Sequence, residues 1–237
     1  MIDAILFDIG GTLWDEYASE LAGWEDMREE LARAGITMSD EELEQRVNAG
    51  IAAYAPSLTR SIIWGAVKGD RVLYDRVLKH VIASIKRRLA DDFYSYNTLF
   101  PGVGEMLESL HGRYKLAVAS NNFIDARVWL RNFGLEKYFS FVGLSEEVWL
   151  FKPDTRFYQL VLDSIGAKPE STMMVGDRLD NDIFPCNRLR MTTVRILSEP
   201  FSRQQPRYHG DLPHYTLERI ADLPKVLGEL EVGEKRT

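Results

Sequence analysis

The feature that most constrains this fold is a short apolar run followed by a polar residue. This pattern occurs three times in the chain. The runs occupy residues 4–7, 116–119 and 172–175, and the polar residues that follow them are Asp8, Ser120 and Asp177. No polar residue alternates with the apolar ones inside a run, which is typical of a strand buried on both faces, as in a parallel sheet. Residues 192–196 predict a further strand.

Helical patterns separate these strands. Apolar residues recur every three or four positions within residues 102–111, 125–133, 154–165 and 218–228. Strands that alternate with helices indicate βαβ units with right-handed crossovers. The sequence therefore predicts an α/β fold, a Rossmann-like three-layer core built on a parallel sheet. Residues 198–213 show no periodicity and three prolines, so we expect an irregular surface loop there.

Residues 15–95 interrupt the alternation. Apolar positions keep helical spacing throughout, Ser39 to Glu42 is typical of a capping box that opens a helix, and no strand pattern is present. About eighty residues is more than a connection needs. We therefore predict an inserted all-α subdomain at 15–95, and a core made of residues 1–14 and 96–237.

Composition excludes several classes of protein. The formal net charge is −7, from 29 basic and 36 acidic residues, so a broad nucleic-acid-binding surface is not expected. Cys186 is the single cysteine, which excludes an intrachain disulfide and suits a reducing compartment. Residues 1–8 contain no basic residue and no apolar run approaches 18 residues, so we expect neither a signal peptide nor a membrane span. We expect a cytoplasmic protein without a membrane partner.

The polar residues at the ends of the predicted strands form a coherent chemical set. In an open α/β sheet the ligand crevice lies outside the carboxyl ends of the strands. Asp8, Ser120 and Asp177 would meet there, and Lys152, after the apolar residues 148–151, is a fourth candidate. Carboxylates bind hard cations, lysine and serine bind phosphate oxygens, and a carboxylate can act as a nucleophile. Each residue alone is equally compatible with a polar strand end or a surface position.

Four short motifs carry a resemblance to a known family. They are Asp8-Ile9-Gly10-Gly11-Thr12-Leu13, Ser120 at a strand end, Lys152-Pro153-Asp154, and Gly176-Asp177 followed by Asn181-Asp182. Their order and spacing resemble those of the haloacid dehalogenase-like hydrolase superfamily, over roughly residues 3 to 227. The helical insert is similar to that family's first type of cap domain, which implies that residues 15–95 cover the site.

The resemblance implies a magnesium site. Asp8 would be both the nucleophile and a Mg²⁺ ligand. The backbone carbonyl of Gly10, the carboxylate of Asp177 and that of Asp182 would be further ligands, the last directly or from just behind the site. Magnesium takes few carboxylates and keeps several waters, which is consistent with this set.

The resemblance also implies a site for the phosphoryl group of a small phosphorylated metabolite. Ser120 and Lys152 would hold the phosphoryl oxygens, and Lys152 would offset the carboxylate charges. Backbone N–H groups of Gly11, Thr12 and Asn121 would add donors. The sequence does not identify the metabolite, and it does not distinguish a monomer from a homodimer.

Gly10 departs from the family pattern, and the functional alternatives differ in how they account for it. Phosphatases of this family carry a second aspartate two residues after the nucleophile, which protonates the leaving group and later activates water. Gly10 stands there, and such acid–base catalysis contributes ~10²–10⁴ in rate. A phosphatase that uses Asp15, water or a good leaving group is the interpretation we favour.

Three other functions remain open from the sequence. A 2-haloacid dehalogenase also lacks that aspartate, but Asp177 is a metal-site feature that such an enzyme does not need. A carbon–phosphorus hydrolase needs a cap lysine where Ala49 stands. A Mg²⁺- and phosphate-binding protein without efficient catalysis would explain Gly10. Trp14, just after the first motif, is either a substrate contact or a packing residue.

Overall fold

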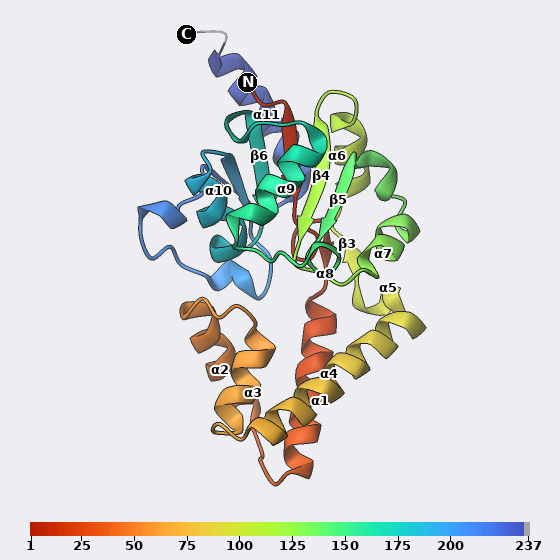
Figure 1. The fold of residues 1–237 in the computed structure, drawn as a ribbon, viewed down its shortest axis with the longest axis vertical. Helices are drawn as coiled ribbons and strands as arrows, with labels where there is room; N and C mark the ends of the chain where they lie inside the picture. The colour runs from red at the N-terminus through yellow and green to blue at the C-terminus, as the bar shows by residue number, and fades with distance from the viewer. Residues whose placement is uncertain (235–237) are drawn as a thin grey trace. The chain divides into compact units, whose positions relative to one another are not determined.

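The computed structural model describes residues 1–234, and a six-stranded parallel sheet forms the middle layer of one of its two compact units (Figure 1). The strand order is β5-β4-β1-β6-β7-β8. The strands are β1 (Ala4–Phe7), β4 (Lys115–Ser120), β5 (Phe141–Leu144), β6 (Thr172–Gly176), β7 (Thr192–Ile196) and β8 (Tyr215–Leu217). All neighbouring strands pair in parallel, so the predicted α/β class is confirmed.

Strand β1 lies in the middle of the sheet, and its neighbours are β4 and β6. Its four residues are fully buried. Phe7 is in register with Val118 on one side and with Val175 on the other. The carboxyl ends of the three strands are therefore aligned, which is the arrangement that brings the polar residues following them to one edge.

Helices cover both faces of the sheet. Alternate residues of β1 face opposite ways, so Ile5 and Phe7 join one apolar cluster while Ala4 and Leu6 join another. The first cluster includes side chains of α6 (Val103–Leu110), α7 (Ala126–Asn132) and α11 (Leu223–Glu234). The second includes side chains of α9 (Thr155–Ile165) and α10 (Phe184–Arg188). Helix, sheet and helix make up the three predicted layers.

Several short elements have no counterpart in the sequence prediction. They are β5, β8, α10 and α8 (Ser145–Val148). The strand before Lys152 is β5, not the apolar stretch 148–151, and α8 separates the two. Lys152 therefore lies on a loop beyond α8 rather than at a strand end.

The chain divides into two compact units. One contains Met1–Asp15, Leu99–Ser202 and the chain from Pro206 onward, and the other contains Glu16–Thr98 with Arg203–Gln205. The helices of the second unit are α1 (Tyr17–Arg33), α2 (Asp40–Ala52), α3 (Leu58–Ala66), α4 (Arg71–Asp91) and α5 (Phe93–Tyr96). Two short strands, β2 (Trp14–Asp15) and β3 (Thr98–Leu99), form a separate sheet.

A side-chain cap and close helix packing order the helical unit. The Ser39 hydroxyl accepts a hydrogen bond from the Glu42 amide at 3.1 Å and so caps α2. Helices α1 and α4 pack together, and Gly23 allows the side chain of Ile85 to approach the α1 backbone. No helix within residues 1–234 is long and apolar enough to cross a membrane.

Candidate active site

Asp8 is fixed at the carboxyl end of β1 by its own backbone. Its amide donates to the carbonyl of Val175 at 2.9 Å, which continues the pairing of β1 with β6. Its Oδ1 accepts from the Ile9 amide at 2.8 Å, and the residue is 8% exposed. The carboxylate is therefore oriented by one backbone donor and retains a small opening to solvent.

A tight turn follows Asp8. The Gly11 amide donates to the Trp14 carbonyl at 2.9 Å, and the Thr12 amide donates to the Ile9 carbonyl at 3.2 Å. Sequence reasoning assigned both amides to the phosphoryl group, and in this conformation the turn itself uses them. Gly10 lies two residues beyond Asp8, at the start of this turn. Its carbonyl stays a predicted metal ligand.

Gly11 is required by both conformation and space. Its φ is +66°, in the left-handed region that favours glycine. A Cβ at this position would lie 2.5 Å from Asp177 Oδ2 and 2.7 Å from the Ser198 hydroxyl. Glycine at position 11 therefore lets the backbone of the first motif approach the Asp177 carboxylate more closely than a residue with a side chain could.

Lys152 joins two carboxylates. Its Nζ lies 2.8 Å from Asp8 Oδ2 and 2.7 Å from Asp182 Oδ1, and its side chain is 1% exposed. Burial by itself would lower the pKa of Lys152, but the charges of Asp182 and Asp8 outweigh it and raise that pKa. The ammonium is therefore held in its charged form beside the candidate nucleophile.

Asn121 holds the backbone that carries Lys152. Its Oδ1 accepts from the Lys152 amide at 2.8 Å, and its Nδ2 donates to the Lys152 carbonyl at 3.0 Å. Asn121 directly follows β4, so this pair ties the strand end to the lysine loop. Ser120, the last residue of β4, is 2% exposed and in register with Leu144 of β5. The assignment of both residues to a phosphoryl group stays a prediction.

Asp177 and Asp182 complete a buried acidic cluster. One carboxylate oxygen from each, together with one from Asp8, lies within 4.8 Å of the others. Asp182 is fully buried and uses both oxygens, because Oδ1 accepts from Lys152 and Oδ2 accepts from the Arg178 amide at 3.0 Å. This geometry favours a role for Asp182 behind the site, where it positions Lys152.

The pKa values reflect the crowding of these carboxylates. Burial and the negative charges of Asp182 and Asp8 raise the pKa of Asp177 well above its usual range. Burial also raises the pKa of Asp182, to about 6, although Lys152 lowers it and Asp8 raises it further. The positive charges of Arg178 and Lys152 lower the pKa of Asp177, but by less than burial and the two neighbouring carboxylates raise it.

These residues fit a divalent cation of the hard type. Carboxylate oxygens are ligands that Mg²⁺ prefers, and Asp8, Asp177 and Asp182 bring three of them together in a buried group. The Gly10 carbonyl stays a predicted ligand. The Gly11 backbone lies directly against the Asp177 carboxylate, with no room between them for a side chain.

Sequence reasoning missed the loop after β7. It buries Ser198, whose hydroxyl donates to Asp177 Oδ2 at 3.2 Å. Arg195, buried on β7, donates to the Asp177 carbonyl at 3.3 Å and to the Phe201 carbonyl at 2.7 Å. The expectation of a purely irregular surface loop is wrong, because short 3₁₀ turns at Phe201–Arg203 and His209–Asp211 order it. An arginine inside an apolar strand was the available signal.

Trp14 is a packing residue. It is fully buried and makes ring contacts with Trp129 and Phe133, with centroids 6.5 Å and 5.5 Å away. The alternative that it faces a substrate is therefore wrong.

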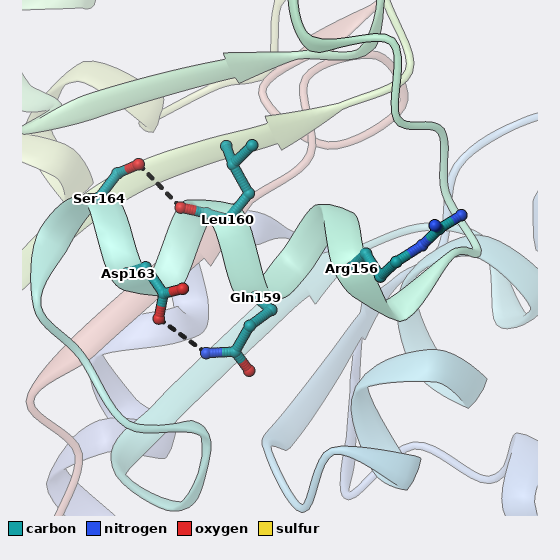
Figure 2. A pocket seen from close by; sticks show the side chains of 5 residues that line it. All are labelled: Arg156, Gln159, Leu160, Asp163 and Ser164. Atoms are coloured by element: carbon teal, nitrogen blue, oxygen red, sulfur yellow. Dashed lines mark hydrogen bonds between the residues drawn. The ribbon is translucent and has the colours of Figure 1, made fainter.

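A hollow of ≈ 560 Å³ on α9 is separate from the acidic cluster and is lined by Arg156, Gln159, Leu160, Asp163 and Ser164 (Figure 2). All five residues belong to one helix, and two hydrogen bonds join them to one another, Gln159 to Asp163 and Ser164 to the Leu160 carbonyl. None of them belongs to the set predicted from the strand ends.

Asp8 follows a central strand of a parallel sheet and lies beside a buried lysine and two further aspartates. This arrangement is typical of a class of α/β hydrolases. The family model of the haloacid dehalogenase-like hydrolases matches residues 2–187, and the chain belongs to this family. The resemblance seen in the four motifs is thereby confirmed, and with it the expectation of a hydrolase.

Individual relatives span nearly the whole chain. A glyceraldehyde 3-phosphate phosphatase of Methanopyrus kandleri is 29% identical over 97% of this chain and 99% of its own. The crystal structure of a HAD phosphatase from Thermococcus onnurineus has a TM-score of 0.69 at 23% identity, over 96% and 98% of the two chains. A 2-haloacid dehalogenase from Pseudomonas syringae pv. Tomato has a TM-score of 0.61 at 24% identity, over 97% and 100%. The two structures establish the fold, which both activities share.

Proposed function

We propose that this protein is a Mg²⁺-dependent phosphatase that acts on small phosphorylated metabolites through an aspartyl-phosphate on Asp8. The observation that carries the proposal is the position of Lys152, whose Nζ joins Asp8 and Asp182 beside Asp177. The near full-length relative that is a glyceraldehyde 3-phosphate phosphatase supports this reaction and suggests a triose phosphate as the first substrate to test.

Asp8 supplies the nucleophile. Its carboxylate attacks the phosphorus in line, the Asp8 Oδ–P bond forms, and the P–O bond to the leaving group breaks. Water then attacks the same phosphorus, releases inorganic phosphate and regenerates the carboxylate. The Ile9 amide orients Asp8 through a 2.8 Å hydrogen bond, so little reorganisation precedes the attack.

Lys152 provides fixed positive charge for the transferring group. Its ammonium lies 2.8 Å from Asp8 Oδ2 and faces the oxygens of a phosphoryl group bound there. Asp182 and Asn121 hold the lysine from behind, one through Nζ and the other through its backbone. Ser120 at the end of β4 is the second proposed phosphoryl contact.

Asp8, Asp177 and the Gly10 carbonyl are the proposed Mg²⁺ ligands, with Asp182 behind them. Bound Mg²⁺ supplies the positive charge that offsets these carboxylates and the phosphoryl oxygens. Residues 15–95 are proposed to act as a cap that excludes water and selects the substrate.

Gly10 shapes the kinetics of this reaction. No carboxylic acid at position 10 protonates the leaving group. Either water protonates it, or a leaving group of low pKa departs unprotonated. Hydrolysis of the aspartyl-phosphate also lacks a base at this position, and we expect it to limit turnover. The dehalogenase and the non-catalytic binding protein are less well supported, because the former has no use for Asp177 and the latter has no use for a nucleophile.

The test is an activity panel with metal control. Purified protein is incubated with glyceraldehyde 3-phosphate, other sugar phosphates and an aryl phosphate, each with Mg²⁺ and with EDTA, beside 2-chloropropionate with halide detection. Phosphate release that EDTA abolishes is expected. Halide release that is indifferent to EDTA would instead identify a dehalogenase. Silence on every substrate, with Mg²⁺ still raising the melting temperature, would identify a binding protein.

A further inference from the structure

The carboxylate of Asp177 has one side-chain hydrogen-bond donor that comes from outside the four sequence motifs. The Ser198 hydroxyl donates to Asp177 Oδ2 at 3.2 Å. Both residues are almost fully buried, Asp177 with 4% and Ser198 with 8% of its surface exposed. The contact therefore lies in a low-dielectric environment, although at 3.2 Å it is longer than a typical O–H···O hydrogen bond.

The same oxygen faces the first motif. A Cβ at Gly11 would lie 2.5 Å from Asp177 Oδ2 and 2.7 Å from the Ser198 hydroxyl, so the three groups meet at one point. The Gly11 backbone closes one side of the carboxylate and Ser198 closes another. Rotation of the Asp177 carboxylate is limited by both neighbours.

The loop that carries Ser198 is fixed by Arg195. The guanidinium donates to the Asp177 carbonyl at 3.3 Å, and its Nη2 donates to the Phe201 carbonyl at 2.7 Å and the Ser202 carbonyl at 3.3 Å. One buried side chain thus ties the backbone of Asp177 to the turn that follows Ser198. This fixes the distance between the hydroxyl and the carboxylate.

We propose that Ser198 is a positioning residue for the metal site: its hydroxyl holds Asp177 in the rotamer that binds Mg²⁺. The inference rests on the proposed function for the presence of Mg²⁺ and adds a residue that none of the four motifs contains. Hydrogen-bond partners of metal-ligating carboxylates typically change metal affinity by about 10- to 100-fold. Ser198 does not contact the substrate in this proposal, so its effect reaches catalysis through the metal alone.

The experiment measures Mg²⁺ binding to the full chain by titration calorimetry, without substrate. Ser198→Ala is expected to weaken Mg²⁺ binding about 10-fold, and Ser198→Thr, which keeps the hydroxyl, is expected to restore most of it. Ser202→Ala is the matched control, because it removes the hydrogen bond between Ser202 and Glu199 in the same loop and leaves Asp177 untouched. Phosphate release provides a second readout: Ser198→Ala should need more Mg²⁺ for half-maximal rate yet approach the wild-type kcat at saturation.

The outcomes separate the inference from the proposed function. Wild-type Mg²⁺ affinity in a folded Ser198→Ala, with cooperative thermal unfolding, overturns the role of Ser198 alone. A Ser198→Thr variant that is folded and as weak as Ser198→Ala overturns it as well, because the hydroxyl would then be irrelevant. Absence of Mg²⁺ binding by the wild-type protein overturns both proposals.

Discussion

Lys152 Nζ lies 2.8 Å from Asp8 Oδ2, in a lysine side chain that is 1% exposed. The two residues are 144 positions apart in the sequence and meet because β1 and β4 are neighbours and Asn121, after β4, holds the lysine loop. With the proposed Mg²⁺ bound, this ammonium would offset part of the negative charge that a phosphoryl group brings to the opening beside Asp8. This pair is the physical reason for placing a phosphoryl group at Asp8.

Replacing Lys152 by methionine should impair both stability and activity. The substitution leaves Asp8 and Asp182 without their shared counter-ion in a buried site, and breaking such a pair costs about 3–5 kcal/mol. Phosphate release should fall at least ~10²-fold, as when one electrostatic donor is lost from an active site. Lys168→Met, at an exposed position, is the control and should change stability by less than about 0.5 kcal/mol. Denaturant unfolding at pH 7 gives the comparison, and equal stability of the two variants would contradict it.

Gly11→Ala should separate conformational strain from the loss of the metal site. Gly11 at φ +66° and Gly35 at φ +80° both adopt the left-handed region, so alanine costs about 1–2 kcal/mol at either. Only at Gly11 does the new Cβ meet a carboxylate, Asp177 Oδ2 at 2.5 Å, while Gly35 has open space around it.

The measurement for this pair is Mg²⁺ affinity. Titration calorimetry should show at least ~10-fold weaker Mg²⁺ binding for Gly11→Ala, as for other losses around a metal-bound carboxylate. Gly35→Ala should bind as the wild type does. Equal affinities in both variants would show that the close approach of Gly11 to Asp177 has no bearing on the metal.

Gly10→Asp should raise the steady-state rate of phosphate release. The substitution introduces a carboxyl group at the position where the family resemblance implies an acid–base aspartate, and such catalysis contributes ~10²–10⁴ when fully realised. The positive φ in this turn belongs to Gly11 and not to Gly10, so a side chain at position 10 meets no backbone strain. An increase of about 10-fold in kcat is expected, less than the full effect because the surrounding site has not adapted.

Gly10→Asn is the matched control for that experiment. Asparagine has nearly the same size and cannot exchange a proton, so its kcat should stay at or below the wild-type value. If both variants gain equally, side-chain volume rather than acid–base catalysis explains the change. If neither gains, another group in the site already performs the proton transfer.

The sequence predicts the core well where the physical signal is local and strong. Residues 4–7 contain no polar side chain and are followed by a glycine turn, which is typical of a strand buried on both faces, and β1 confirms this prediction. Gly166, with φ +59°, ends α9 as its position after an apolar helical stripe predicts. Strands β5 and β8 escape prediction, because Gly143 interrupts the apolar run of β5 and β8 has only three residues, one of them polar.

The candidate site shows the same division. Asp8 and Asp177 follow strands that pair with each other in the sheet, so their proximity follows from topology alone. Hydrogen bonds that depend on three-dimensional packing could not be predicted, and the amides of Gly11 and Thr12 illustrate this because the turn uses them itself. Ser198 lies in a segment without any motif, and only its contact with Asp177 reveals it.

The most direct test of the central claim is to trap the phosphorylated enzyme. Wild-type protein with Mg²⁺ and ³²P-labelled substrate, quenched in acid during turnover, should carry a hydroxylamine-labile label on the peptide that contains Asp8. Asp8→Asn, shown by circular dichroism to be folded, should carry no label and release no phosphate above background. Turnover that survives in Asp8→Asn, or a label that maps to a different peptide, would contradict the assignment of Asp8 as the nucleophile.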